Sequence, residues 1–339
     1  MRSIILKSAI CAGLLGAIGA CSQAPAPDTG DAVRVVALPY LTHMPFYIAQ
    51  AEGYFEAENL DVEFVTLGRN QEVMTSLAQG DVDVMAGMLT LNELSLAEAG
   101  ARIRVVAAFA SPAPPEAECA QAGILIRREH LESGAAVDPV RLGQLKYDIN
   151  PYIPLGYALD SLLGRHGLSI DDVETVDLPP VVALEALRGG QVDVTADSEP
   201  FVARHQLGGE AVLWASLNDV LPEFQQSVVL FGPALVDERP EVGKRFMAAL
   251  LRAMRQFRGG KTPENLAIVE QASGLPADLV AAACWPTLTE DGRANPAAFG
   301  GYQEWCVRRG LLDHVVLGHG RHYSFADEGQ LPDEPRYPG

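Results

Sequence analysis

Three acidic residues, Asp148, Asp197 and Glu199, stand near the ends of predicted strands and the starts of predicted helices. Their carboxylates could accept hydrogen bonds from the N–H or O–H groups of a small molecule. The sequence contains no G-x-S-x-G elbow, no H-E-x-x-H motif, no P-loop and no G-x-G-x-x-G turn between a strand and a helix. We therefore expect ligand binding, no catalytic residue and no cofactor. Asp197 is the stronger candidate, because Glu199 precedes Pro200 and suits the geometry of a helix start.

A strand, a loop and a helix begin the predicted folded part of the chain. β-branched residues over 33–36 favour a buried strand, and Pro45 suits the first turn of a helix, where no backbone hydrogen bond is lost. Gly53 is expected to end that helix, and a β-rich segment over 60–65 completes a βαβ unit. Open α/β sheets bind ligands at the carboxyl ends of their strands. The loop that follows the first strand is therefore expected to contact a ligand through Tyr40, Leu41, Thr42 and His43.

This region resembles the start of the periplasmic solute-binding proteins that serve ABC importers for nitrate, alkanesulfonates, taurine and thiamine-pyrimidine precursors. The resemblance rests on one ordered set of residues: Pro39, Pro45, Tyr47, Ala49, Gly53, Tyr54, Phe55, Leu60 and Val62. It continues in order from about residue 33 to 313. It implies a two-lobed α/β fold of type II, in which each lobe is a mainly parallel sheet flanked by helices and the ligand lies between the lobes. It also implies an ABC permease and its ATPase as partners.

The sequence contains two similar halves. A predicted helix followed by a Gly-x-Val-Asp-Val turn and strand occurs first at Gly80 and again at Gly190. Each half should end a strand at the cleft, with Met88 and Leu89 from the first and with Asp197 and Glu199 from the second. We divide the chain into a signal peptide (1–20), a tether (21–31), lobe 1 (32–122), lobe 2 (123–229), a return to lobe 1 with C-terminal helices (230–317) and an irregular tail (318–339).

The N-terminus predicts export. Arg2 and Lys7 precede an apolar stretch over 9–18 that ends in small residues before Cys21. The stretch is too short to cross a hydrocarbon core of about 30 Å. Small residues before a cysteine form a lipobox, in which the thiol receives a lipid before cleavage. We expect a lipoprotein anchored at Cys21 on the periplasmic side of a bacterial membrane; an ordinary signal peptide with an incidental cysteine is the alternative.

Composition limits the partners. Hydrophobic residues make up 48% of the chain, enough for a core, and the formal net charge of −19 makes nucleic acid an unsuitable partner. We expect a monomer that contacts the membrane through its lipid alone. The spacing of His314, His319 and His322 lacks a neighbouring cysteine or carboxylate pattern, so no metal site is expected.

An exported location permits a disulfide. Once the signal is removed and Cys21 carries a lipid, Cys119, Cys284 and Cys306 remain. We favour the pair Cys284 and Cys306, which share the C-terminal helical region; free buried cysteines are the alternative.

The loop before a predicted helix over 158–164 bears on the ligand. In the family that this chain resembles, the loop and the helix N-terminus meet the ligand, and anion-binding members place small hydroxyl residues and glycines there. Exposed backbone N–H groups and the helix dipole favour an oxyanion. This chain instead has two prolines, which remove donors, among large side chains. The candidate ligand residues of this loop are Asn150, Tyr152, Ile153 and Tyr157.

These features predict a receptor that captures a small organic nutrient by closing two lobes and delivers it to a permease. The ligand is expected to be neutral or cationic with a partly aromatic or apolar body, such as a pyrimidine-like molecule. The alternatives are a ligand-sensing lipoprotein for signalling, a sulfonate- or nitrate-type anion receptor, and an enzyme related to those of pyrimidine synthesis.

Overall fold

The computed structural model describes residues 30–66, 70–110, 119–222, 224–225, 227–289 and 292–317. The predicted signal peptide, Cys21, most of the tether and the tail over 318–339 lie outside these residues, as do His319 and His322. Within the described part, none of the helices is long and apolar enough to cross a bilayer.

The first lobe is built on a five-stranded sheet. β1 pairs in parallel with β2 and with β3, whereas β10 runs antiparallel to both β3 and β4. The predicted βαβ unit is confirmed. In spatial order the strands are β2 (Leu60–Phe64), β1 (Asp31–Val36), β3 (Val84–Gly87), β10 (Val228–Phe231) and β4 (Arg104–Ala108).

The second lobe repeats this arrangement. β6 is parallel to β7 and β8, and β5 is antiparallel to β8 and β9. Each sheet therefore contains one antiparallel strand next to a parallel group, which agrees with the two similar halves seen in the sequence. In spatial order the strands are β7 (Glu174–Val176), β6 (Lys146–Asp148), β8 (Val194–Ser198), β5 (Ala122–Arg127) and β9 (Ala211–Ser216).

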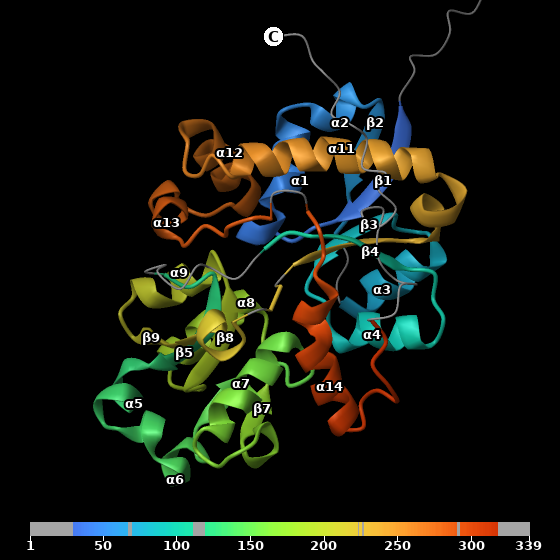
Figure 1. Ribbon diagram of the computed structural model, residues 1–339. Helices are drawn as coiled ribbons and strands as arrows, with labels where there is room; N and C mark the ends of the chain where they lie inside the picture. Colours follow the sequence, from blue (N-terminus) through green and yellow to red (C-terminus); the bar gives the residue numbers. More distant parts are fainter. Residues whose placement is uncertain are drawn as a thin grey trace, which may run out of the picture.

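Helices cover both faces of the first sheet, and α11 crosses one face at the top of Figure 1. Phe246 of α11 packs against the rings of Phe46, Phe55 and Phe231, so its apolar stripe closes the core on that side. The lobe 1 helices are α1 (Met44–Ala51), α2 (Tyr54–Ala57), α3 (Asn70–Gln79), α4 (Leu91–Glu98), α11 (Pro240–Phe257), α12 (Pro263–Ser273) and α13 (Ala277–Ala282).

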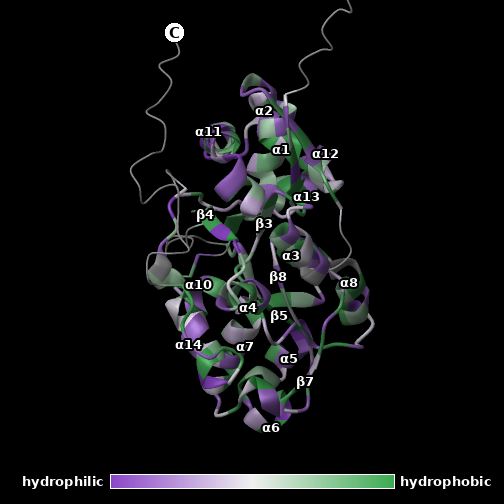
Figure 2. Ribbon diagram, turned by 90° about the vertical axis from the view of Figure 1, so that its right-hand side faces the viewer, coloured by the Kyte–Doolittle hydropathy of each residue, from purple (hydrophilic) through white to green (hydrophobic). Residues whose placement is uncertain are grey.

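The second lobe lies below the first in Figure 2, with α6 at its far end. Its largest helix, α7, begins just after a cleft-facing loop and buries Leu155, Leu159 and Leu163. The helices of this lobe are α5 (Arg128–Glu132), α6 (Pro139–Leu142), α7 (Pro154–Gly164), α8 (Pro180–Arg188), α9 (Phe201–Leu207) and α10 (Leu217–Val220).

The chain returns to lobe 1 slightly earlier than expected. We placed the end of lobe 2 at residue 229, but β10 begins at Val228 and pairs with Gly87 of β3, so residues 228 and 229 belong to the first sheet. The sequence of this apolar strand does not tell which of the two sheets it joins.

The last helix, α14 (Gly300–Arg308), departs from its expected place in lobe 1. Trp305 Nε1 donates a hydrogen bond to Asp160 of α7 at 2.7 Å, so α14 packs against lobe 2 (Figure 1). Beyond the helix, the backbone N–H of Asp313 donates to Glu98 of α4 at 2.9 Å. The C-terminal segment therefore connects the two lobes.

The predicted disulfide is wrong. Cys119 bonds to Cys284, with their Cα atoms 5.7 Å apart, and Cys306 is a free buried cysteine of α14. Nearness in sequence misled the prediction, because α14 packs on α7 of lobe 2, whereas Cys284 lies beside Cys119 at the crossing between the lobes.

Candidate functional site

A cavity of about 310 Å³ lies between the lobes. Lobe 1 contributes the loop after β1, the end of β3 with the start of α4, and the residue before β10. Lobe 2 contributes the ends of β6 and β8, the loop leading into α7, and the segment between β7 and α8. The carboxyl ends of the parallel strands thus meet at one cleft, as open α/β sheets require.

The first wall is fixed by local hydrogen bonds. His43 ends a short 3-10 turn before α1, and its Nδ1 lies 2.9 Å from the carbonyl oxygen of Leu38, which can only accept. Burial lowers the pKa of His43 to about 4, so the ring is neutral, Nδ1 carries the proton and Nε2 is an acceptor. Thr90 begins α4 with a capping box in which its backbone N–H donates to Glu93 at 2.7 Å.

The second wall carries two buried carboxylates. Asp148 accepts hydrogen bonds from the backbone N–H of Leu178 at 2.9 Å and from the hydroxyl of Thr195 at 2.8 Å. Asp197 accepts from the backbone N–H of Ser198 at 2.8 Å and lies 3.3 Å from Nε2 of His205.

Burial raises the pKa of both carboxyl groups above their ordinary range, and the charge of Asp197 raises the pKa of Asp148 further. A positive charge or an N–H donor in the cavity would therefore stabilise the two ionised side chains together.

The cavity lining is acidic in the part of the chain that the structure describes. Asp148, Asp177 and Asp197 all line the cavity, and no Lys or Arg does so among the residues that the structure describes. Ser227 of the opposite wall has a buried hydroxyl without a hydrogen-bond partner in the structure. Buried polar groups are normally paired, so a ligand that bonds to this hydroxyl would satisfy it.

The structure brings seven predicted residues together at this cavity. Both lobes contribute to the set, as a cleft between two strand-end loops requires. They are Tyr40, Thr42, His43, Met88, Asn150, Ile153 and Asp197.

Five other predicted residues do not line it. Leu41 and Leu89 are buried in the hydrophobic cores, because each follows a cavity residue and its side chain points the other way. Tyr152 is 48% exposed. These positions share a cause, since a loop or strand end can present only some of its consecutive side chains to one cavity.

The side chains of two predicted residues make contacts outside the cavity lining: Tyr157 packs against α14, and Glu199 accepts hydrogen bonds. Tyr157 lies on the face of α7 that meets α14, with its ring centroid 5.5 Å from that of Trp305. The carboxylate of Glu199 accepts from the backbone N–H groups of Cys284 and Ala203, so it lies outside the cavity lining.

Sequence reasoning missed Ser227 and Asp177 as cavity residues. Ser227 precedes β10, which is antiparallel to β3, so the beginning of β10 lies beside the carboxyl end of β3. A run of apolar residues does not show whether its strand will be parallel or antiparallel to its neighbours. No local pattern therefore indicated that Ser227 would lie at the cavity. Within the described residues, no group of three or more His, Cys, Asp or Glu side chains could hold a metal ion.

Solved structures with the same fold include two ligand-binding proteins. The ligand-binding component of an ABC-type import system from Staphylococcus aureus, with zinc bound, has a TM-score of 0.69 at 14% identity, covering 88% of this chain and 95% of that one. The alkanesulfonate-binding protein SsuA from Xanthomonas axonopodis pv. citri, bound to MOPS, has a TM-score of 0.66 at 19% identity, covering 84% and 96%.

A third structure is an enzyme. The desulfurization enzyme DSZB has a TM-score of 0.58 at 15% identity, covering 84% of this chain and 94% of that one. At these identities the likeness shows the fold, which is the type II periplasmic binding protein fold. No curated protein matches the sequence. The family model for the NMT1-like family matches residues 27–273, and the chain belongs to that family.

Proposed function

We propose that this protein is the substrate-binding lipoprotein of an ABC importer, held at the periplasmic side of a bacterial membrane by a lipid on Cys21. The two-lobed fold, the cavity between the lobes and the ligand-binding proteins of similar structure, one of them a component of an ABC-type import system, support this proposal. The lobes close over a small molecule and remove it from water, and the closed form presents it to a permease coupled to an ATPase. The receptor acts as a monomer and performs no chemistry.

The ligand is a small neutral or cationic organic molecule with a partly apolar or aromatic body. The observation that carries this choice is the acidic lining, in which three aspartates face the cavity without a lysine or arginine among the described residues. A bare oxyanion would be repelled by these carboxylates, whereas a ligand N–H or a positive charge would be attracted. Tyr40, Met88 and Ile153 supply apolar surface for the rest of the molecule.

Two alternatives have a specific observation behind them. The SsuA structure bound to MOPS favours a sulfonate receptor, and DSZB favours an enzyme on this fold. The acidic lining opposes the first. The second calls for a catalytic group, but the sequence contains none of the catalytic motifs sought, and Nδ1 of His43 in the cavity is already bonded to Leu38. A sensing lipoprotein would use the same closure to contact a signalling protein.

A thermal-shift panel tests the ligand class. We expect thiamine, cytosine or choline to raise the melting temperature, and nitrate, taurine and ethanesulfonate to leave it unchanged. A ligand present at about 100 times its dissociation constant stabilises the folded state by about 2.7 kcal/mol. Asp197→Asn should abolish the shift caused by a cation, whereas Asp81→Asn, at an exposed position in lobe 1, should retain it. Stabilisation by the oxyanions alone would overturn the ligand class and leave the receptor function standing.

A further inference from the structure

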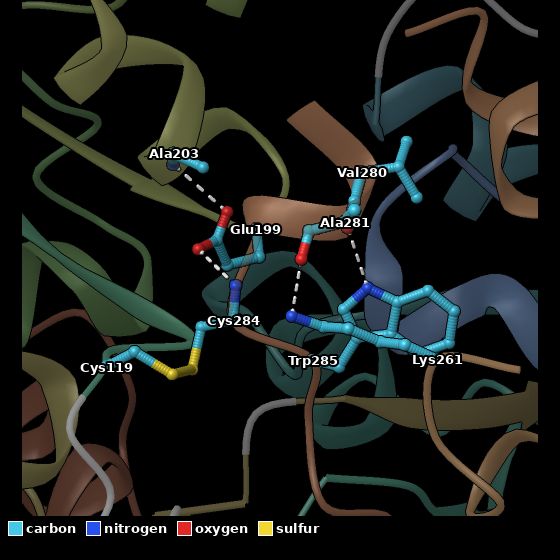
Figure 3. Close-up of a disulfide and its surroundings, with 8 residues drawn as sticks. All are labelled: Cys119, Glu199, Ala203, Lys261, Val280, Ala281, Cys284 and Trp285. Carbon is cyan, nitrogen blue, oxygen red and sulfur yellow. Dashed lines mark hydrogen bonds between the residues drawn. A yellow bond between two sulfur atoms is a disulfide. The ribbon is translucent and has the colours of Figure 1, made fainter. Parts of the chain in front are cut away.

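Glu199 joins the two lobes through its backbone and its side chain. It follows β8 of lobe 2 and is buried. Its carbonyl oxygen accepts from the N–H of Leu41 at 3.0 Å, and its Oε1 accepts from the N–H of Cys284 at 2.9 Å. Its Oε2 accepts from the N–H of Ala203 in α9 at 3.1 Å (Figure 3). Two of these three bonds cross from lobe 2 to lobe 1.

The segment around Cys284 is also held by a disulfide to the crossing between the lobes and by two hydrogen bonds within lobe 1. Cys284 is bonded to Cys119, just before β5, and the side chain of Trp285 donates to the carbonyl of Val280 at 3.0 Å. Lys261 donates to the carbonyl of Ala281 at 2.6 Å, so the segment is tied at both ends (Figure 3). The bond from Cys284 to Glu199 therefore lies beside the crossing between the lobes, and its strength bears on how the lobes are oriented.

The bond at Leu41 connects Glu199 to the ligand site. Leu41 lies between Tyr40 and Thr42, which both line the cavity. We propose that Glu199 is a positioning residue: it holds the loop 38–44 and the backbone at Cys284 against the end of β8, and its carboxylate sets how firmly the lobes are held over the cavity. This inference rests on the proposed function only in taking that cavity as the ligand site.

The charge state of Glu199 should control the strength of this contact. An ionised carboxylate accepts well at both oxygens, whereas the hydroxyl oxygen of a protonated carboxyl is a poor acceptor. One of the two side-chain bonds, to Cys284 or to Ala203, then weakens on protonation. Glutamine imitates the protonated group, because its amide nitrogen cannot accept a hydrogen bond.

The burial and the charges around Glu199 place the protonation of its carboxyl group near neutral pH. Burial raises the pKa of Glu199 to about 7. The charge of Asp197 on β8 raises it further, whereas Lys261, between α11 and α12, lowers it, as do the two backbone donors. Asp197 is itself paired with His205 on α9.

Hydrogen exchange of the ligand-free protein tests the proposal. We expect exchange at Cys284 or Ala203, corrected for its intrinsic pH dependence, to accelerate as the pH falls through about 7, by roughly five- to tenfold for the loss of one side-chain hydrogen bond. Glu199→Gln should exchange at the fast rate at every pH. Glu185→Gln, at an exposed position on α8 of the same lobe, should behave as the wild type.

The pH dependence of exchange is measured on the wild-type protein, so it tests the proposal even if the Glu199→Gln variant does not fold. Protection at both amides that stays constant with pH, or a folded Glu199→Gln variant with the protection of the wild type, would overturn the role of Glu199. Because these measurements use no ligand, that result would leave the proposed receptor function standing.

Discussion

The buried aspartates of lobe 2 cost stability when they are ionised in the ligand-free protein. Asp148 and Asp197 end neighbouring parallel strands, so their charges are held close together and away from water. Their pKa values are raised chiefly by burial, which means that the folded protein resists ionising them. Functional sites commonly contain buried ionisable groups of this kind, because their cost to the stability of the fold is offset by their role in function.

We expect Asp148→Asn to stabilise the ligand-free protein increasingly as the pH rises. Asparagine can keep both bonds, by accepting from Leu178 and donating to the hydroxyl of Thr195. A carboxyl whose pKa is raised on folding stabilises the fold at low pH, and this stability is lost as the pH rises through the raised pKa. The variant lacks this loss. Urea-induced unfolding at about pH 4 and about pH 8 measures the difference.

Asp172→Asn provides the matched control. This exposed aspartate caps a turn through Ser169, and its pKa is lowered by these hydrogen bonds. Its removal should cost stability at high pH, which is the opposite sign. An Asp148→Asn variant that is destabilised equally at both pH values would show that the hydrogen bonds outweigh the burial of the charge.

At the scale of elements, the approach of α7 to its preceding loop depends on one glycine. A Cβ at Gly156 would lie 2.7 Å from the carbonyl oxygen of Asn150 and 2.8 Å from the backbone of Pro151. Asn150 and Ile153 line the cavity, so the helix N-terminus and the cavity wall are packed directly on each other.

We expect Gly156→Ala to destabilise the protein by about 1–3 kcal/mol, because backbone atoms would have to move to admit the methyl group. Thermal unfolding gives the stability, and titration with whichever panel compound is bound gives the change in affinity. Both should fall, since the displaced loop carries the cavity residues.

The control is Gly164→Ala at the other end of the same helix. Apart from the backbone of its own helix and its chain neighbours, no atom of the described residues lies within 4 Å of a Cβ built there, so the substitution should be neutral or stabilise by about 0.4–1 kcal/mol through the unfolded state. Equal stability of the two variants would mean that the loop over 150–151 moves freely away from α7.

At the scale of the whole molecule, the disulfide ties the crossing between the lobes to the C-terminal region. Cys119 and Cys284 are separated by 165 residues, so the bond closes a long loop in the unfolded chain. Closing a long loop restricts the unfolded state strongly and thereby favours the fold.

Replacing both cysteines by serine should lower the free energy of unfolding by about 2–4 kcal/mol. Reduction of the wild type should have a comparable effect, measured by chemical denaturation with and without a reductant. Peptide mapping without reduction identifies the bond directly, and a peptide that joins Cys284 to Cys306 would contradict the structure. Cys306→Ala, which leaves the disulfide intact, is the control and should retain the effect of the reductant.

The sequence determined the parts whose signals are local. Pro45 and Gly53 bounded α1, the helix predicted before Gly80 became α3, and the two Gly-x-Val-Asp-Val turns entered equivalent strands of two sheets. These signals depend on backbone geometry and on the period of apolar residues, and both are properties of a short segment. The same local patterns sufficed to place Tyr40, His43 and Asp197 at the cleft.

Tertiary structure alone decided which neighbouring residues share a surface. Leu41 and Glu199 each stand next to cavity residues in the chain, yet one is buried in a core and the other joins the lobes. Ser227 reached the cavity because β10 is antiparallel to β3, and Cys284 met Cys119 because the chain crosses between the lobes there. Strand direction, helix docking and disulfide partners depend on contacts between segments far apart in sequence, and no single segment encodes them.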